Sequence, residues 1–167
     1  MRILSVLCML VLLLAPSFSL AHPHFNKTVS VKLPGGAEAT IAYQTVPANV
    51  SHAENAPDGT FVTPRRPSLE LSAAVSAGGT ELPAGQYTIG VVKNGADDWS
   101  MGLYKGGLNR GDTPDMANVI KLDSMYSSSM GTADHMLIDI TPGHGKFEGK
   151  AVLTLHFGTM YLAGVLS

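Results

Sequence analysis

Histidine is the residue type of this chain whose spacing best suits metal chemistry. His22 and His24 stand two residues apart in the stretch His-Pro-His-Phe near the amino terminus. If proteolysis freed the amino group of His22, that nitrogen and the ring Nδ1 would chelate one ion, and His24 would add another nitrogen. Imidazole suits copper, zinc and nickel, and copper(II) is bound most tightly of these. The alternative interpretation is that residues beside a cleavage site fray and carry histidine without a role.

The residues before His22 predict that this amino group is produced. An apolar stretch over 3–15 follows a single arginine and precedes a short region of small residues, which is the layout of a signal peptide. We expect residues 1–21 to be removed by cleavage between Ala21 and His22, and residues 22–167 to form a single exported domain, periplasmic or extracellular. No later stretch reaches the roughly 20 apolar residues that a bilayer crossing requires, so we expect no membrane span in the mature form.

A second histidine pair is predicted within a hairpin. Segments 134–141 and 150–157 alternate apolar and polar residues and flank a glycine-rich turn. In the register that we expect, His135 faces His156 on the side away from the core. Directly opposed residues have Cβ atoms about 4.5–5.5 Å apart, so the two rings could share one ion. A register change of two residues would separate them, and a simple polar pair is the alternative.

Other residue types give weaker signals. Methionine thioethers can select copper(I), but the methionines are scattered, and Met136 is best interpreted as core filling. Trp99 could stack on a sugar, but burial is its expected role. Gly-x-Ser-x-Gly, Walker-type, His-Glu-x-x-His and EF-hand patterns are all absent. We therefore predict no catalytic residue and do not expect an enzyme.

Charge and cysteine content narrow the class further. The chain has 11 Lys and Arg against 13 Asp and Glu, without a basic cluster, so nucleic acid is not expected as a partner. The only cysteine, Cys8, lies in the predicted leader. Neither a disulfide nor a thiol would then act in the mature domain, and burial of apolar side chains must stabilise it.

Short alternating segments separated by Gly, Pro, Asn and Asp are the elements that must position these residues. They predict an all-β fold, an antiparallel β-sandwich (jelly-roll-like) of roughly nine strands. The expected strands are 28–33, 38–45, 68–76, 86–93, 99–104, 119–126, 134–141, 150–157 and 159–166. One short helical turn is expected at 112–115. The six residues expected to form the core face of the last long hairpin are Met136, Ile138, Ile140, Leu153, Leu155 and Phe157.

One connection is unusually long. It runs from Val46 to Pro67, is rich in Pro, Asn and Ala, and carries His52, Arg65 and Arg66. Loops of this length in compact domains are usually functional or mobile. We interpret it as a lid or binding loop.

Three motifs resemble a known family. They are Leu-Pro-Ala-Gly-Gln-Tyr-Thr-Ile at 82–89, Asp-Asp-Trp-Ser-Met at 97–101 and Leu-Thr-Leu-His-Phe-Gly at 153–158. Together they are similar to an uncharacterised family of secreted bacterial domains, domain of unknown function 2911, over most of the chain from about Ala39. The resemblance implies a β-sandwich and no activity. Typical members have a Gly- and Arg-rich loop where this chain has Pro-Arg-Arg-Pro at 64–67, which indicates a divergent member.

The first-residue histidine is similar to a ligand device found in periplasmic copper carriers of β-sandwich fold and in copper-dependent polysaccharide monooxygenases. We therefore expect a secreted or periplasmic non-catalytic binding module that binds copper or zinc through His22, His24, His135 and His156. The alternative is a structural or interaction domain that recognises an envelope protein or glycan through the connection at 46–67, without metal. A copper oxidase is a minor third possibility, because the chain has one tryptophan and few tyrosines to form an aromatic surface.

Overall fold

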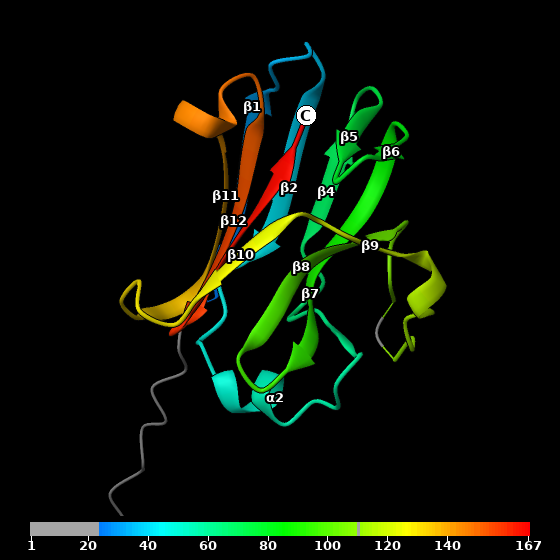
Figure 1. Cartoon of the computed structure of the whole chain (residues 1–167). Coiled ribbons are helices and arrows are strands. Elements are labelled where there is room, and N and C mark those ends of the chain that lie inside the picture. The colour runs from blue at the N-terminus through cyan, green and yellow to red at the C-terminus, as the bar shows by residue number, and fades with distance from the viewer. Residues whose placement is uncertain (1–23, 110) are drawn as a thin grey trace, which may run out of the picture.

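Two antiparallel sheets face each other in the computed structural model, which describes residues 24–109 and 111–167 (Figure 1). The larger sheet has the order β1-β2-β4-β7-β8-β9, with β3 also paired to β7. Its strands are β1 (Asn26–Lys32), β2 (Glu38–Gln44), β3 (Phe61–Val62), β4 (Ser68–Leu71), β7 (Gly85–Gly95), β8 (Asp98–Lys105) and β9 (Val119–Lys121). The predicted all-β sandwich is therefore confirmed.

The smaller sheet has the order β10-β13-β12-β11. Its strands are β10 (Ser124–Ser127), β11 (Ala133–Pro142), β12 (Ala151–Gly158) and β13 (Met160–Leu166). A separate hairpin joins β5 (Val75–Ala77) to β6 (Thr80–Leu82). Within residues 24–109 and 111–167, the helical elements are α2 (Val50–Glu54) and two single turns, η1 (Met116–Asn118) and η2 (Gly145–Phe147). In the part of the chain that the structure describes, no helix is long and apolar enough to cross a membrane.

The described residues form thirteen strands rather than the expected nine or so, because two expected strands are divided and two short strands, β3 and β6, were not expected. The segment 68–76 bends after Leu71 and resumes as β5. The segment 119–126 leaves the larger sheet after β9 and enters the smaller sheet as β10. Buried Leu122 lies at this crossing, and its backbone N–H donates to the carbonyl of Met101 at 2.9 Å. The expected helical turn also forms slightly later than predicted, as η1, with the Asp115 carboxylate accepting from the N–H of Ala117.

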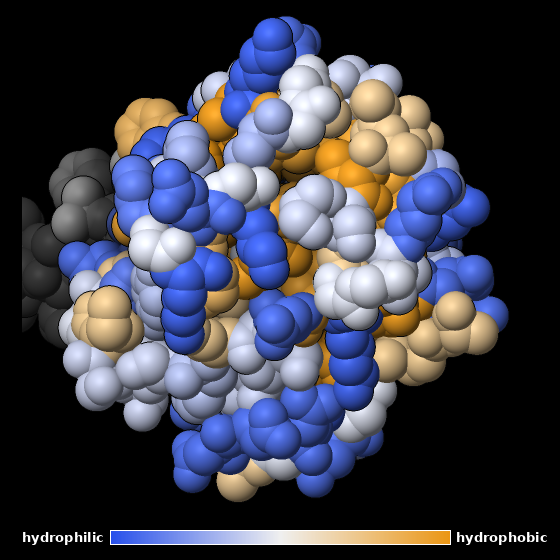
Figure 2. All heavy atoms as spheres, turned by 45° about the horizontal axis from the view of Figure 1, so that its top comes forward, coloured by the Kyte–Doolittle hydropathy of each residue, from blue (hydrophilic) through white to orange (hydrophobic). Residues whose placement is uncertain are grey.

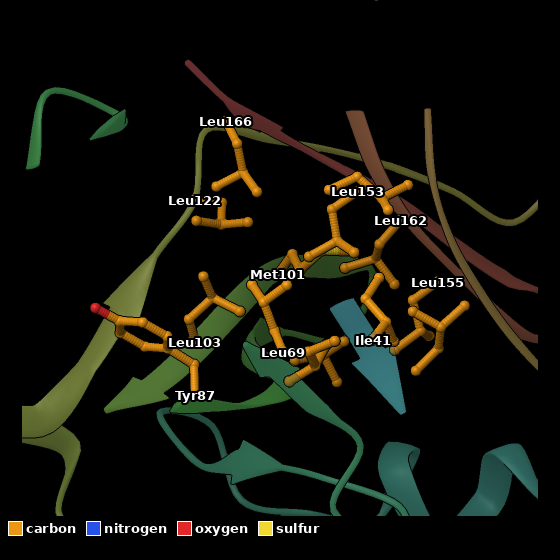
Figure 3. Close-up of a cluster of buried hydrophobic side chains, with 14 of the residues drawn as sticks. Ile41, Leu69, Tyr87, Met101, Leu103, Leu122, Leu153, Leu155, Leu162 and Leu166 are labelled. Atoms are coloured by element: carbon orange, nitrogen blue, oxygen red, sulfur yellow. The ribbon is translucent and has the colours of Figure 1, made fainter. Parts of the chain in front are cut away.

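The core fills the space between the two sheets. Figure 3 shows Ile41, Leu69 and Met101 of the larger sheet pointing toward Leu153 and Leu162 of the smaller one. Burying one such side chain contributes about 1.5–3 kcal/mol. All six residues predicted for the core face of the β11–β12 hairpin are buried, as is Trp99. Viewed obliquely from the end at the top of Figure 1, hydrophilic residues surround a small central area where apolar atoms are visible (Figure 2).

The predicted register of the β11–β12 hairpin is wrong by two residues. His156 lies opposite Leu137, not His135, and the pairing is irregular between Ala133 and Leu137. The cause is the turn: η2 occupies its middle and the N–H of Gly143 donates to the carbonyl of Lys150, so regular pairing begins at Pro142 and Ala151. A shift of two residues keeps every side chain on its face, which is why the core prediction is nevertheless right.

Candidate binding site

The connection at 46–67, hereafter the cap segment, is tied to the sandwich rather than hanging free. Its first residues pair with β11, where the N–H of Met136 donates to the carbonyl of Val46 at 2.8 Å and the N–H of Ala48 to that of Asp134 at 2.9 Å. It then forms α2 and β3, and β3 pairs with β7. α2 lies at the lower end of the molecule in Figure 1. The cap segment therefore closes one end of the sandwich.

Lys93 of β7 holds the middle of the cap segment. Its ammonium group donates to the carbonyl oxygens of Glu54 at 2.6 Å and Ala56 at 2.9 Å, and lies 3.7 Å from a carboxylate oxygen of Asp58. Its backbone carbonyl accepts from the N–H of Gly59 at 2.7 Å. The Lys93 side chain is only 12% exposed, whereas that of Asp58 is 65% exposed, so the two carbonyl bonds rather than the ion pair hold the segment.

Phe61 fixes the far end of the cap segment. Its buried ring covers Gly90 of β7 and Gly102 of β8, which are paired directly opposite each other. A Cβ atom on Gly90 would lie 2.5 Å from the ring Cζ and 2.6 Å from the carbonyl oxygen of Val62. Two adjacent glycines therefore form the flat seat that lets β3 pack against the sheet.

A cavity of about 630 Å³ lies beneath the cap segment, and we call it the end cavity. This volume is in the range of small-molecule sites. Its apolar wall is formed by Val46, Pro47, Ala53, Val62, Pro64, Val91, Leu155, Phe157 and Met160. Its polar lining consists of His24, Asn49, His52, Thr63 and Arg65. Among the described residues, the lining thus combines apolar side chains with basic ones and contains no carboxylate.

His24 is held in one ring orientation. Its Nδ1 lies 3.1 Å from the carbonyl oxygen of Thr45, and because a carbonyl can only accept, Nδ1 must carry the hydrogen. In the neutral ring, Nε2 is then left with a lone pair. The same threonine accepts from the N–H of Phe25 through its hydroxyl at 3.0 Å, which fixes the backbone beside the ring. Metal-binding histidines characteristically use this arrangement, in which the second ring nitrogen donates to a carbonyl.

The turn that carries Arg65 is strained. Arg65 and Arg66 have φ angles of 55° and 50°, in the left-handed region that residues with a Cβ rarely adopt. Such conformations cost on the order of 1–3 kcal/mol each and persist where the surroundings impose them. Both flanks of the turn are anchored to Ile89 of β7. The hydroxyl of Thr63 donates to the carbonyl of Ile89, and the backbone N–H of Ile89 donates to the carbonyl of Pro67.

Of the described histidines predicted as metal ligands, only His24 lines the end cavity, and His52 beside it in the lining was predicted as part of the binding loop. His135 is half-buried and pairs with Pro47 of the cap segment, whereas His156 lies on the outer face of the smaller sheet, edge-on to Tyr161 with ring centroids 5.5 Å apart. His135 and His156 therefore do not face each other as predicted.

Two further observations bear on the predicted metal site. His22 lies outside the described residues. Over 24–109 and 111–167, no group of three or more His, Cys, Asp or Glu side chains is placed to hold an ion.

Sequence reasoning did not identify Lys93 or the seat at Gly90 and Gly102 as parts of this site. The signal that was available is the content of the cap segment, which carries His52, Arg65 and Arg66 in a chain of net charge −2. Which of these residues face a cavity depends on the long-range anchoring through Lys93 and Phe61, and local sequence does not reveal it.

No protein-family model, curated protein or solved structure matches this chain. What the site can bind therefore follows from its own geometry. An apolar wall with a few basic groups suits a small molecule with an apolar body.

Proposed function

We propose that this protein is an exported, non-catalytic binding module and that its ligand occupies the end cavity. The observation that carries the proposal is the cavity itself, which is of small-molecule size, is walled by apolar side chains and has few polar groups. The proposed export rests on the signal-peptide pattern of residues 1–21. An envelope protein or glycan contacting the cap segment is the alternative.

The chemistry of the lining favours binding over catalysis. Among the described lining residues, His24 and His52 could act as bases, but there is no thiol, no orienting carboxylate and only one hydroxyl, that of Thr63. The hydroxyl of Thr63 already donates to the carbonyl of Ile89 at 2.8 Å. Nucleophilic catalysis needs a hydroxyl or thiol paired with a base and an orienting group, and this lining supplies no such set.

Titration with the neutral fluorescent probe N-phenyl-1-naphthylamine tests the proposal. We expect saturable binding with one probe per chain, and we expect Val62→Trp, which fills part of the cavity, to weaken it at least tenfold. Val152→Trp is the matched control, because Val152 is also half-buried but lies outside the lining. Absence of saturable binding, or equal binding by both folded variants, would overturn the proposal.

A transition metal at the mouth of the cavity is the second candidate, favoured by the fixed ring of His24. We propose that copper or zinc would be bound by Nε2 of His24 together with His52, and by His22 if cleavage exposes its amino group. Neither His135 nor His156 lines the end cavity.

Calorimetric titration with copper(II) and zinc(II) tests the metal candidate. We expect His24→Ala to weaken binding at least tenfold and His144→Ala, in the exposed turn of the β11–β12 hairpin, to leave it unchanged. Amino-terminal sequencing of the exported chain shows whether His22 is the first residue. Equal affinity in the two variants would exclude His24 as a ligand.

The membership of domain of unknown function 2911 also remains a proposal. It is supported by the positions of the motifs, since residues 82–89 form the turn into β7 and residues 97–101 open β8. If the family has the same β-sandwich, the turn into β7 and the start of β8 are positions where the fold itself restricts the residue type. The motifs imply a fold and no activity, so membership of the family would leave the proposed ligand unchanged.

A further inference from the structure

The described lining of the end cavity is basic, whereas the chain as a whole is slightly acidic. The described residues of this lining include an arginine and two histidines and no acidic residue, although the whole chain carries a net charge of −2. Basic groups gathered around a concave, low-dielectric wall concentrate the positive potential there and attract anions. The lining therefore favours a ligand with a negative group over a neutral or cationic one.

Arg65 is the group best suited to meet that charge. In the described part of the chain, the one ion pair joins Lys93 to Asp58, and the guanidinium of Arg65 has no hydrogen-bond partner there. A guanidinium offers five N–H donors in a planar fork. That fork matches the two oxygens of a carboxylate.

The turn fixes the backbone of Arg65, whose side chain is exposed. Prolines at 64 and 67 flank it, and Ile89 binds the residues on both sides, so the left-handed backbone at Arg65 and Arg66 is imposed by the sheet. Backbone strain of this kind is most often retained where it positions a functional group. Because the backbone is anchored, the Arg65 side chain starts from a fixed point beside the cavity that it lines.

We propose that the ligand of the end cavity is a carboxylate on an apolar chain or ring, and that Arg65 pairs with the carboxylate at the mouth while the apolar part packs against Leu155, Phe157 and Met160. This inference rests on the proposed function, because it names the ligand class of the same cavity. A single carboxylate is specified because Arg65 is the one residue of the described lining with a permanent positive charge; Arg66 does not line the cavity.

Three molecules with the same eight-carbon chain test the head group: octanoate, 1-octanol and octylammonium, titrated into the folded protein and followed by chemical-shift changes. We expect octanoate to bind at least about tenfold more tightly than 1-octanol, since a hydrogen-bonded charge pair contributes that much. Octylammonium should bind most weakly. If 1-octanol or the neutral probe binds but octanoate gains nothing, the carboxylate inference fails and the proposed function stands. If no molecule binds, both fail.

Variants of the turn locate the contact. We expect Arg65→Gln to weaken octanoate binding at least tenfold and to leave 1-octanol binding unchanged, and Arg65→Lys to retain part of the difference. Arg66→Gln is the matched control, one residue away with the same backbone conformation, and should bind octanoate as the parent protein does. Equal octanoate affinity in Arg65→Gln and the parent protein would overturn the role of Arg65.

Discussion

The ammonium group of Lys93 donates a hydrogen bond of 2.9 Å to the backbone carbonyl of Ala56, across 37 residues of chain. It makes a second bond to the carbonyl of Glu54, so one side chain of the larger sheet satisfies the last carbonyl of α2 and one carbonyl two residues beyond it. Helix-end carbonyls lack partners within the helix, and a cation placed there is favourable. Lys93 therefore links the larger sheet to the middle of the cap segment, as Phe61 links it to the end.

Replacing Lys93 by methionine should loosen the cap segment. Methionine keeps the length of the side chain but removes both hydrogen bonds to the cap, which should lower the free energy of unfolding by about 1–3 kcal/mol. Amide hydrogen exchange should become faster for residues 50–59 while the core strands keep their protection. Lys105→Met, at an exposed position of β8, is the control. Unchanged exchange in the cap segment would show that Lys93 does not hold it.

The packing of Phe61 on Gly90 and Gly102 leads to a second prediction about the cap segment. Gly90→Ala should displace the Phe61 ring and the strand β3, because the new Cβ would lie closer than 3 Å to both the ring and the Val62 carbonyl. We expect a loss of about 1–3 kcal/mol in the free energy of unfolding, the usual cost of overpacking, and weaker binding of the neutral probe. Gly35→Ala adds the same methyl group where no atom lies within 4 Å and should change neither quantity. Equal stability of the two variants would contradict the seat.

Much of the fold is predictable because the period-two pattern records which side chains face the core. Met136, Ile138 and Ile140 could be assigned to the interior without knowing their exact partners. The partner of His156 could not be assigned, because registers that differ by two residues bury the same side chains. The turn determines the register, because η2 contains residues that a regular hairpin would pair.

The site was less predictable than the fold for a related reason. The length and composition of the cap segment indicated a binding role, and His52 and Arg65 within it do line the cavity. What places them there is the contact of Lys93 and Phe61 with residues distant in sequence, and neither residue carries a pattern of its own. His24 could be predicted as a candidate ligand, whereas its bond to Thr45 depends on the entry of the chain into β1.

Strain at Arg66 leads to a prediction in which a substitution raises stability. Arg66→Gly should raise the free energy of unfolding by about 0.5–1 kcal/mol, because relief of the left-handed conformation outweighs the extra entropy of glycine in the unfolded chain. Octanoate binding should be retained, since Arg65 is unchanged. Lys105→Gly, at a position with an ordinary strand conformation, should instead lower the free energy of unfolding. Chemical denaturation measures both, and a loss of stability in both variants would show that the turn is not strained.

Burial of Tyr87 leads to a prediction about alkaline stability. Burial raises the pKa of its phenol, whose hydroxyl donates to the carbonyl of Pro83 at 2.7 Å. Burial also raises the pKa of Tyr126, with a further contribution from the negative charges of Asp97 and Glu54. A pKa raised on folding means that the neutral form is favoured in the native state. The resulting stabilisation is complete below about pH 10, the unfolded value, and is lost as the pH rises through the higher native value.

We therefore expect the free energy of unfolding to fall as the pH is raised above about 10, and to fall less steeply in Tyr87→Phe, which retains only the contribution of Tyr126. At pH 8 the variant should be about 1 kcal/mol less stable than the parent because the bond to Pro83 is lost. The difference in the free energy of unfolding between the two proteins should then shrink with rising pH, because only the parent loses stability through ionisation of a tyrosine at position 87. Urea denaturation at intervals between pH 8 and pH 11 measures this convergence. Parallel curves over the whole range would mean that the Tyr87 phenol is not protected from ionisation by burial.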